Sequence, residues 1–266
     1  MDTLEARWAR LEPHAAIHGP DDAQTRPVVL LFHGCGGVQG HLDDYAAEAT
    51  RAGWRSVIVD SFAPRGWSRA YGLTFVCSGT RFWGFERAGD VLATIHGMSR
   101  RDDVDPTRVV LAGWSHGGWA IMDLMTMALE SEAEARIGGA GPGLLDGVKG
   151  AFFSYPYVNF GTRGAKRDWR YRPKVMGVIA RRDHLGAPKL HEAVYTRARA
   201  AGCEVETVTL EGTHAFDQPG EALISLSPMQ RDEGLFRENV ARFGGFLGSL
   251  HGPSPLGGEG GPAGVG

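Results

Sequence analysis

The sequence has few cysteines, no long apolar run and little net charge. Cys35, Cys77 and Cys203 are its three cysteines, too few and too scattered for a disulfide framework or a cysteine-rich metal site. No stretch approaches the roughly 18 apolar residues of a transmembrane helix. The net charge of −3 gives no general attraction to nucleic acid or anionic membranes. We therefore expect no nucleic-acid partner, no membrane partner, and no metal or cofactor.

The N-terminal segment lacks the apolar stretch of a signal peptide. Charged side chains interrupt it at Asp2, Glu5, Arg7, Arg10 and Glu12. A soluble, cytoplasmic protein is the resulting expectation, and nothing in the sequence indicates an oligomeric state.

Glycine, by contrast, is abundant. The chain has 39 glycines in 266 residues, about twice the average share of about 7%. Seven of them, with three prolines, fall in the last sixteen residues, HGPSPLGGEGGPAGVG. Such a segment cannot bury enough apolar surface to offset the entropy of ordering. We predict a single domain over residues 1–250 and a disordered tail over residues 251–266.

Short apolar runs rich in β-branched residues recur along the chain and predict strands covered on both faces. They lie at residues 28–32, 55–60, 108–114, 148–155, 174–180 and 205–211. Segments with helical spacing lie at residues 41–52, 85–100, 117–130, 187–201 and 231–249. This alternation predicts an α/β fold, an open and mostly parallel sheet flanked by helices, with a short extra strand around residues 13–18.

A candidate nucleophile follows the third strong strand. The segment Gly113-Trp114-Ser115-His116-Gly117 matches the G-x-S-x-G pattern, in which small residues allow a sharp strand-to-helix turn that exposes the serine. Glycine abundance raises the expected number of accidental matches to about 0.2, so the position of the match between a predicted strand and a predicted helix carries the inference. We predict that Ser115 is the catalytic nucleophile.

A serine hydroxyl needs a histidine to take its proton and a carboxylate to orient that histidine. Asp183 follows the strand at 174–180 and His214 follows the strand at 205–211. Both therefore fall at the same sheet edge as Ser115, in the chain order Ser, Asp, His that α/β-hydrolases use. We predict a Ser115–His214–Asp183 triad.

The oxyanion formed during acyl transfer needs two backbone N–H donors. The residue after the nucleophile, His116, supplies the first. The turn His33-Gly34-Cys35-Gly36-Gly37 follows the first strong strand, and we predict Cys35 as the second donor, with Gly36 as the alternative. His33 is expected to brace this turn.

Several motifs together resemble one known family. HGCGG (33–37), DSFAPRG (60–66), GWSHGG (113–118), Asp183 and THAFD (213–217) occur in the order found in the dienelactone hydrolase family of the α/β-hydrolase superfamily. The resemblance spans about residues 28–217. It implies a compact α/β-hydrolase fold without a large separate lid domain, acting on esters or lactones without a metal.

One position departs from that family. Typical dienelactone hydrolases have a cysteine in the nucleophile turn, whereas this chain has Ser115. A serine requires a general base at the moment of attack rather than a stored thiolate. The resemblance therefore favours a serine esterase that forms an acyl-enzyme intermediate.

Two loops at this sheet edge predict the substrate site. Residues 61–83 carry three arginines and no acid, and residues 157–172 carry five basic residues and one acid. This asymmetry suggests an anionic substrate; a solvated basic face, or pairing with acids from elsewhere, is the alternative. The predicted substrate-binding residues are Arg65, Arg81, Trp67, Trp83 and Tyr157.

Cys35 and Cys77 are both expected at this edge of the sheet, where a disulfide could join the loops that carry them. The absence of a secretion signal instead favours two free thiols. Two other functions stay open. A peptidase or amidase of the same fold would share the triad, but we expect no propeller or other gating domain. A non-catalytic binding protein would lack or misplace a triad member.

Overall fold

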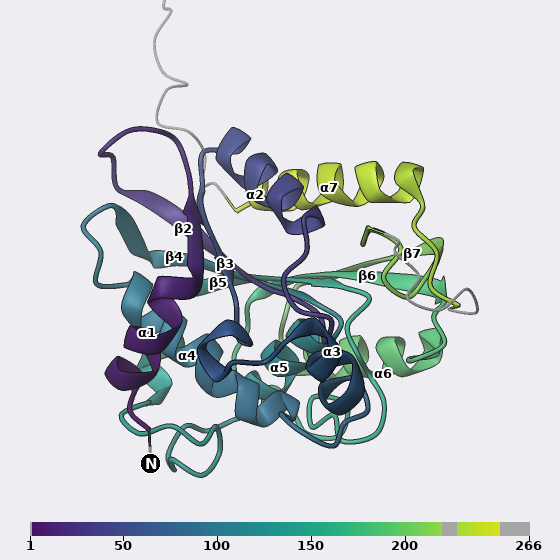
Figure 1. Ribbon diagram of the computed structural model, residues 1–266, viewed down its shortest axis with the longest axis horizontal. Coiled ribbons are helices and arrows are strands. Elements are labelled where there is room, and N and C mark those ends of the chain that lie inside the picture. Colours follow the sequence, from purple (N-terminus) through teal and green to yellow (C-terminus); the bar gives the residue numbers. More distant parts are fainter. Residues whose placement is uncertain (1, 220–227, 251–266) are drawn as a thin grey trace, which may run out of the picture.

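The computed structural model describes residues 2–219 and 228–250, and its central feature is one sheet in the order β1-β3-β2-β4-β5-β6-β7 (Figure 1). The strands are β1 (Ala15–His18), β2 (Arg26–Phe32), β3 (Arg55–Val59), β4 (Val104–Trp114), β5 (Val148–Ser154), β6 (Lys174–Arg182) and β7 (Val205–Thr213). Only β1 pairs antiparallel; the other neighbouring strands are parallel. The predicted mostly parallel sheet is confirmed, and the extra strand forms its edge.

Helices cover both faces of the sheet (Figure 1). One face carries α2 (His41–Arg51) and α7 (Glu233–Gly248), and the other carries α1 (Leu4–Leu11), α4 (Gly84–Met98), α5 (His116–Leu124) and α6 (Pro188–Ala200). The five helices expected from the sequence are thus present. The two layers explain why the inner strands β2, β3 and β5 are buried over most of their length, whereas the edge strands β1 and β7 are partly exposed.

Strand β2 illustrates this double burial. Val28, Leu30 and Phe32 pack into the core beneath α1, α4 and α5. Val29 and Leu31 point to the opposite face, into the core beneath α2 and α7. Each buried aliphatic or aromatic side chain contributes about 1.5–3 kcal/mol relative to exposure. The continuous apolar run is therefore required by the layers on either side of it.

The helix α1 was not predicted from the sequence. Its charged residues obscure a stripe of three buried side chains, Leu4, Trp8 and Leu11. Trp8 packs on α4 at Gly97, where an added Cβ would lie 2.3 Å from the indole. The close contact between Trp8 and Gly97 explains why α1 lies directly on the domain.

The helix expected over 117–130 is shorter in the structure, because α5 ends at Leu124. Beyond it, the Glu134 carboxylate accepts the backbone N–H of Ala128, and Leu129 has a positive φ of 57°. These interactions hold the chain in a loop where its composition favours a helix.

The loop over residues 61–83 also contains helical structure that was not expected. A short helix, α3 (Arg69–Tyr71), continues into a π-helical turn at Gly72–Val76. The predicted tail, residues 251–266, lies outside the described residues, so the domain boundary at residue 250 stays a prediction.

Candidate active site

Ser115 occupies a strained turn between β4 and α5, with φ 48° and ψ −112°. The adjacent glycines make this turn possible. A Cβ on Gly113 would lie 2.5 Å from the backbone N of Gly118, and a Cβ on Gly117 would lie 2.0 Å from the Phe32 carbonyl oxygen. Since no other residue fits these positions without a backbone shift, the glycines of the motif hold the serine at the tip of the turn.

His214 lies within hydrogen-bond distance of both other predicted triad residues. Ser115 Oγ is 2.8 Å from His214 Nε2, and His214 Nδ1 is 2.7 Å from Asp183 Oδ2. They come from the ends of β4, β6 and β7, which meet at one edge of the sheet. The hydrogen bonds orient the imidazole so that Nε2 can accept the serine proton.

Asp183 is held as a carboxylate. Its second oxygen, Oδ1, accepts the backbone N–H groups of Leu185 (2.8 Å) and Gly186 (3.2 Å). Burial alone would raise the pKa of Asp183, but the hydrogen bonds from His214 and from Leu185 outweigh it, and the pKa is lowered. Asp183 therefore stays ionised near neutral pH and can stabilise a protonated His214.

The triad is enclosed rather than exposed. Ser115, His214 and Asp183 are 4%, 3% and 9% exposed. The Tyr155 ring packs edge-on against His214 with ring centres 5.0 Å apart, and the His184 ring centre lies 6.0 Å from that of His214. Water is thereby largely excluded from the imidazole, which strengthens the electrostatic interactions within the triad.

The turn predicted to hold the oxyanion lies directly beside Ser115. A Cβ on Gly34 would be 3.4 Å from Ser115 Cβ. The N–H of Gly37 donates to the Gly34 carbonyl and closes the turn around Cys35. His116 is the first residue of α5, and the first N–H groups of a helix have no intrahelical acceptor. The structure thus brings both predicted donors close to the serine.

The buried His33 ring stabilises this turn. It is fully buried, its Nδ1 lies 2.6 Å from the Gly34 carbonyl oxygen, and its Nε2 accepts the N–H of Ser61 at 3.1 Å. Burial and the nearby Arg87 charge hold the pKa of His33 well below its ordinary value. These two hydrogen bonds require a neutral imidazole, because Nδ1 must donate and Nε2 must accept.

Cys35 and Cys77 form a disulfide, so the expectation of two free thiols was wrong. The bond joins the turn beside Ser115 to the end of the π-helical segment, 42 residues along the chain. The Cα atoms of Cys35 and Cys77 lie 5.2 Å apart. This proximity depends on how the two loops pack together, which the sequence does not reveal. A disulfide is typical of an oxidising environment and weighs against the expected cytoplasmic location.

Replacing Cys77 with serine should lower the free energy of unfolding by about 2–4 kcal/mol, because the disulfide restricts the unfolded chain. The Cys35 N–H should also lose its fixed position. Urea unfolding without reductant measures the effect, and Cys203→Ser, at the free buried cysteine, is the matched control. Equal stability of wild type and Cys77→Ser would contradict the prediction.

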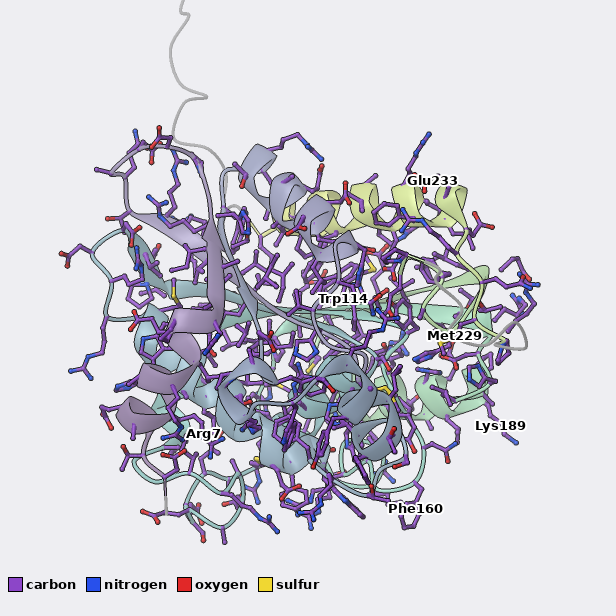
Figure 2. The ribbon with its side chains drawn as sticks, viewed as in Figure 1. Arg7, Trp114, Phe160, Lys189, Met229 and Glu233 are labelled. Carbon is purple, nitrogen blue, oxygen red and sulfur yellow. A yellow bond between two sulfur atoms is a disulfide. The ribbon has the colours of Figure 1, made fainter. Side chains whose placement is uncertain are left out.

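Trp83 and Tyr157 both contact Trp119, in the helix that follows Ser115. The backbone N–H of Tyr157 donates to the Ser115 carbonyl at 3.0 Å, and the Tyr157 ring packs on Trp119 at 5.0 Å. Trp83 contacts both Trp119 and Phe160. Phe160 is 76% exposed and lies at the periphery of the molecule (Figure 2). These rings form an apolar surface that extends from near the serine to the solvent.

Trp67 belongs to a different cluster. It stacks on Tyr71 at 4.9 Å and packs edge-on against Phe62 and Phe82. These contacts stabilise the 61–83 loop. A role for Trp67 in substrate binding stays a prediction.

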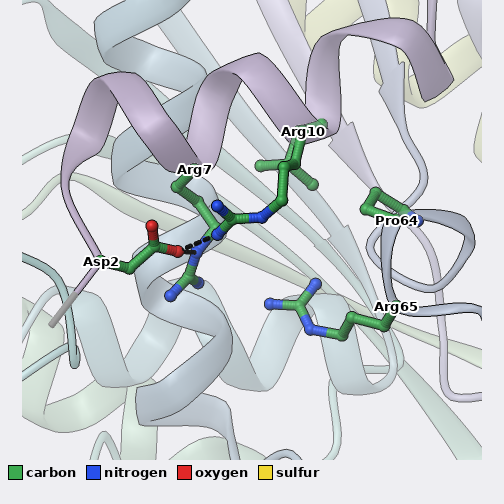
Figure 3. A pocket seen from close by; sticks show the side chains of 6 residues that line it. Asp2, Arg7, Arg10, Pro64 and Arg65 are labelled. Carbon is green, nitrogen blue, oxygen red and sulfur yellow. Dashed lines mark hydrogen bonds and ion pairs between the residues drawn. The ribbon is translucent and has the colours of Figure 1, made fainter.

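Arg65 does not match its expected role. Both of its terminal nitrogens donate to the fully buried Asp90, and one also donates to the Ser61 carbonyl. Arg65 lines a pocket of about 190 Å³ beneath α1, beside the Arg7–Asp2 ion pair (Figure 3). Asp2, Arg7, Arg10, Leu11, Pro64 and Arg65 line this pocket. The Arg65 guanidinium is therefore already paired with Asp90. Pairing with an acid from elsewhere in the chain was the alternative to substrate binding for the basic loops.

Arg81 is exposed on the same loop, as are Lys166, Arg167, Arg170 and Arg172 on the other. Arg163, by contrast, lies over the Phe85 ring, 3.7 Å from its centre. The basic loops thus contain both structural and solvent-exposed charges.

Sequence reasoning missed the buried Asp217. Its carboxylate accepts hydrogen bonds from Tyr45 (2.7 Å), from the Trp114 indole (3.1 Å) and from Tyr155. Asp217 lies three residues after His214, and Trp114 immediately precedes Ser115. The hydrogen bond between Asp217 and Trp114 therefore connects the segments that carry His214 and Ser115. The THAFD motif contained Asp217, but no pattern indicated that these three side chains would converge on it.

Comparisons with known proteins agree with this architecture. The model of the prolyl oligopeptidase family matches residues 49–131, less than a third of the chain. The dienelactone hydrolase-like promiscuous phosphotriesterase P91, from metagenomic libraries, has 14% identity and a TM-score of 0.65, covering 90% of this chain and 92% of its own. Esterase 2 of Thermogutta terrifontis with propionate bound has 17% identity, a TM-score of 0.63 and 91% coverage of each chain. The chain has an α/β-hydrolase fold.

The same esterase, phosphoramylated by tabun, shares the α/β-hydrolase fold with a TM-score of 0.64 at 15% identity, over 89% of each chain. No curated protein has a significantly similar sequence. Within residues 2–219 and 228–250 of this α/β-hydrolase fold, no helix is long and apolar enough to cross a membrane. The same ranges contain no cluster of three or more potential metal ligands.

Proposed function

We propose that this protein is a serine hydrolase that cleaves small esters or lactones through an acyl-enzyme. The observation that carries the proposal is the hydrogen-bonded series of Ser115, His214 and Asp183, with the serine on a turn whose glycines admit no side chain. A non-catalytic binding protein would have no need for this geometry.

The first half-reaction transfers the acyl group to the enzyme. Ser115 Oγ attacks the carbonyl carbon as its proton passes to His214 Nε2. The N–H groups of Cys35 and His116 stabilise the oxyanion, and Asp183 stabilises the imidazolium. When the oxyanion collapses, the bond to the leaving alkoxide breaks, and His214 returns the proton to that oxygen.

Water completes the reaction by the same steps. It gives a proton to His214 Nε2 while its oxygen bonds to the acyl carbon, and collapse releases the carboxylic acid as Ser115 regains the proton. No metal or cofactor takes part in this scheme.

The apolar surface of Trp83, Tyr157 and Phe160 suits an uncharged part of the substrate. An anionic group elsewhere on the substrate is a further proposal, which rests on exposed residues such as Arg81 rather than on Arg65. The structural neighbours include an esterase with bound propionate and a phosphotriesterase, which supports small acyl and phosphoryl esters as the first compounds to test.

A peptidase is the second candidate, favoured by the match to the prolyl oligopeptidase family. The catalytic residues and steps would be shared. The difference is the leaving group, an amine in place of an alkoxide. Hydrolysis of peptide p-nitroanilides faster than matched p-nitrophenyl esters would favour this alternative.

A substrate panel with active-site labelling tests the proposal. Esters, lactones and thioesters that vary in acyl length and charge are compared by kcat/KM, and a fluorophosphonate is added for intact-mass measurement. We expect ester or lactone turnover and one covalent adduct per chain. Absence of both would support the binding-protein alternative, and faster turnover of neutral than of matched anionic esters would contradict an anionic substrate.

A further inference from the structure

Arg87 is a fully buried arginine in α4. Within residues 2–219 and 228–250, no carboxylate oxygen lies within ion-pair distance of it. Asp90, three residues further along the helix, pairs instead with Arg7 and Arg65, and Glu86 pairs with Arg136. A buried charge without a paired countercharge carries a large desolvation cost, and folding alone does not require it at this position.

The contacts of Arg87 converge on the two predicted oxyanion donors. Its Nη1 donates to the His33 carbonyl at 2.7 Å and lies 3.1 Å from His116 Nδ1. Its Nε donates to Ser61 Oγ at 3.2 Å. His33 begins the turn that contains Cys35, and His116 carries the other donor on its own backbone. One guanidinium nitrogen thus connects both halves of the predicted oxyanion hole.

The His116 ring is fixed as the acceptor of this interaction. Its Nε2 lies 2.7 Å from the Phe82 carbonyl oxygen, to which only an N–H can donate, so Nδ1 is unprotonated and faces Arg87. Burial and the Arg87 charge lower the pKa of His116 to about 3. The ring is therefore neutral, and Phe82 stacks on it at 5.9 Å.

The charge of Arg87 also lies in a low-dielectric region. Burial lowers its pKa to about 9, a value at which it is still cationic near neutral pH. Its Nη2 has no hydrogen-bond partner in the part of the chain that the structure describes. A fixed positive charge behind two backbone donors favours negative charge in front of them, where the oxyanion would form.

We infer that Arg87 is a positioning residue that fixes the Cys35 and His116 N–H groups and makes the oxyanion hole electropositive. The inference rests on the proposed serine hydrolase function. It assigns Arg87 no contact with substrate. Its effect should therefore appear in the stabilisation of tetrahedral, anionic species and leave ground-state binding unchanged.

The variants Arg87→Met and Arg87→Lys test this role. Removing one oxyanion donor costs about 10²–10³-fold in kcat in known hydrolases. Arg87→Met displaces both donors but removes neither, so the expected loss in kcat is smaller, about 10–100-fold, with KM within about 2-fold of wild type. Affinity for phenylboronic acid, which forms a tetrahedral anion on a catalytic serine, should fall by a similar factor. Arg87→Lys keeps the charge and should recover part of both losses.

Arg55→Met is the matched control. Arg55 is also buried, but it donates to Asp22 and Asp103 at the opposite end of the strands. It should lose stability and keep kcat per folded molecule, as measured after circular dichroism and thermal melting. If Arg87→Met does not fold, Arg87→Lys alone decides, with an expected loss of at least about 3-fold in kcat and boronate affinity.

Unchanged kcat and boronate affinity in a folded Arg87 variant would overturn the inference. A loss of kcat accompanied by an equally large rise in KM would also overturn the inference, because it would indicate a general structural role for Arg87. Wild-type protein that neither hydrolyses esters nor binds the boronate would instead refute the proposed function.

Discussion

Ser115→Ala is expected to lower kcat/KM for ester hydrolysis by about 10⁴–10⁶-fold, the range for removing a catalytic serine. The variant keeps Cβ and therefore its place beside the turn at Gly34, where an added Cβ on Gly34 would lie 3.4 Å from it. It loses Oγ, the proposed nucleophilic atom, which lies 2.8 Å from His214 Nε2. Fluorophosphonate labelling should disappear together with activity.

The matched control is Ser131→Ala, at an exposed serine in the loop after α5. It should keep wild-type activity and labelling. Thermal melting should show both variants folded, since alanine accepts the strained φ of 48° no worse than serine. Persistent labelling of Ser115→Ala at wild-type rate would show that another residue is the nucleophile.

Much of the fold could be predicted from the chain, because its signals are local. The continuous apolar run of β2 follows directly from helices on both faces, and the position of Ser115 follows from strand, glycine and helix in sequence. Asp183 and His214 follow β6 and β7, and parallel strands end at the same edge. Their catalytic roles stay predictions, although the structure places their side chains in hydrogen-bond contact.

The unpredicted features depend on contacts between distant segments. Arg65 and Asp90 are separated by 25 residues, and their pairing decides whether a loop arginine is available to substrate. Arg87 looks like a surface residue in sequence, yet it is buried behind two turns that lie 29 or more residues away. The periodicity of apolar residues does not indicate which charged side chains become buried when the chain folds.

Asp183→Asn is expected to lower kcat by about 10⁴-fold, the effect of the same change in a known triad. Oδ1 of Asp183 accepts the N–H groups of Leu185 and Gly186. In the variant, the amide oxygen should keep those two bonds, so its NH₂ group must face His214 Nδ1. That nitrogen then becomes the acceptor, and the proton moves to Nε2, which faces Ser115 and can no longer take the serine proton.

The measurement is kcat against pH for wild type, Asp183→Asn and the control Asp168→Asn, at an exposed acid that pairs with Arg197. Because the pKa of Asp183 is lowered below its ordinary 3.8, the carboxylate is ionised above that pH, and its contribution to activity and stability is lost only as pH falls through the lowered value. The carboxylate therefore makes its full contribution from about pH 5 to 8, and the loss in Asp183→Asn should be present throughout that range. A loss below about 10-fold, or a variant that regains activity as pH rises, would show that Asp183 does not set the tautomer of His214.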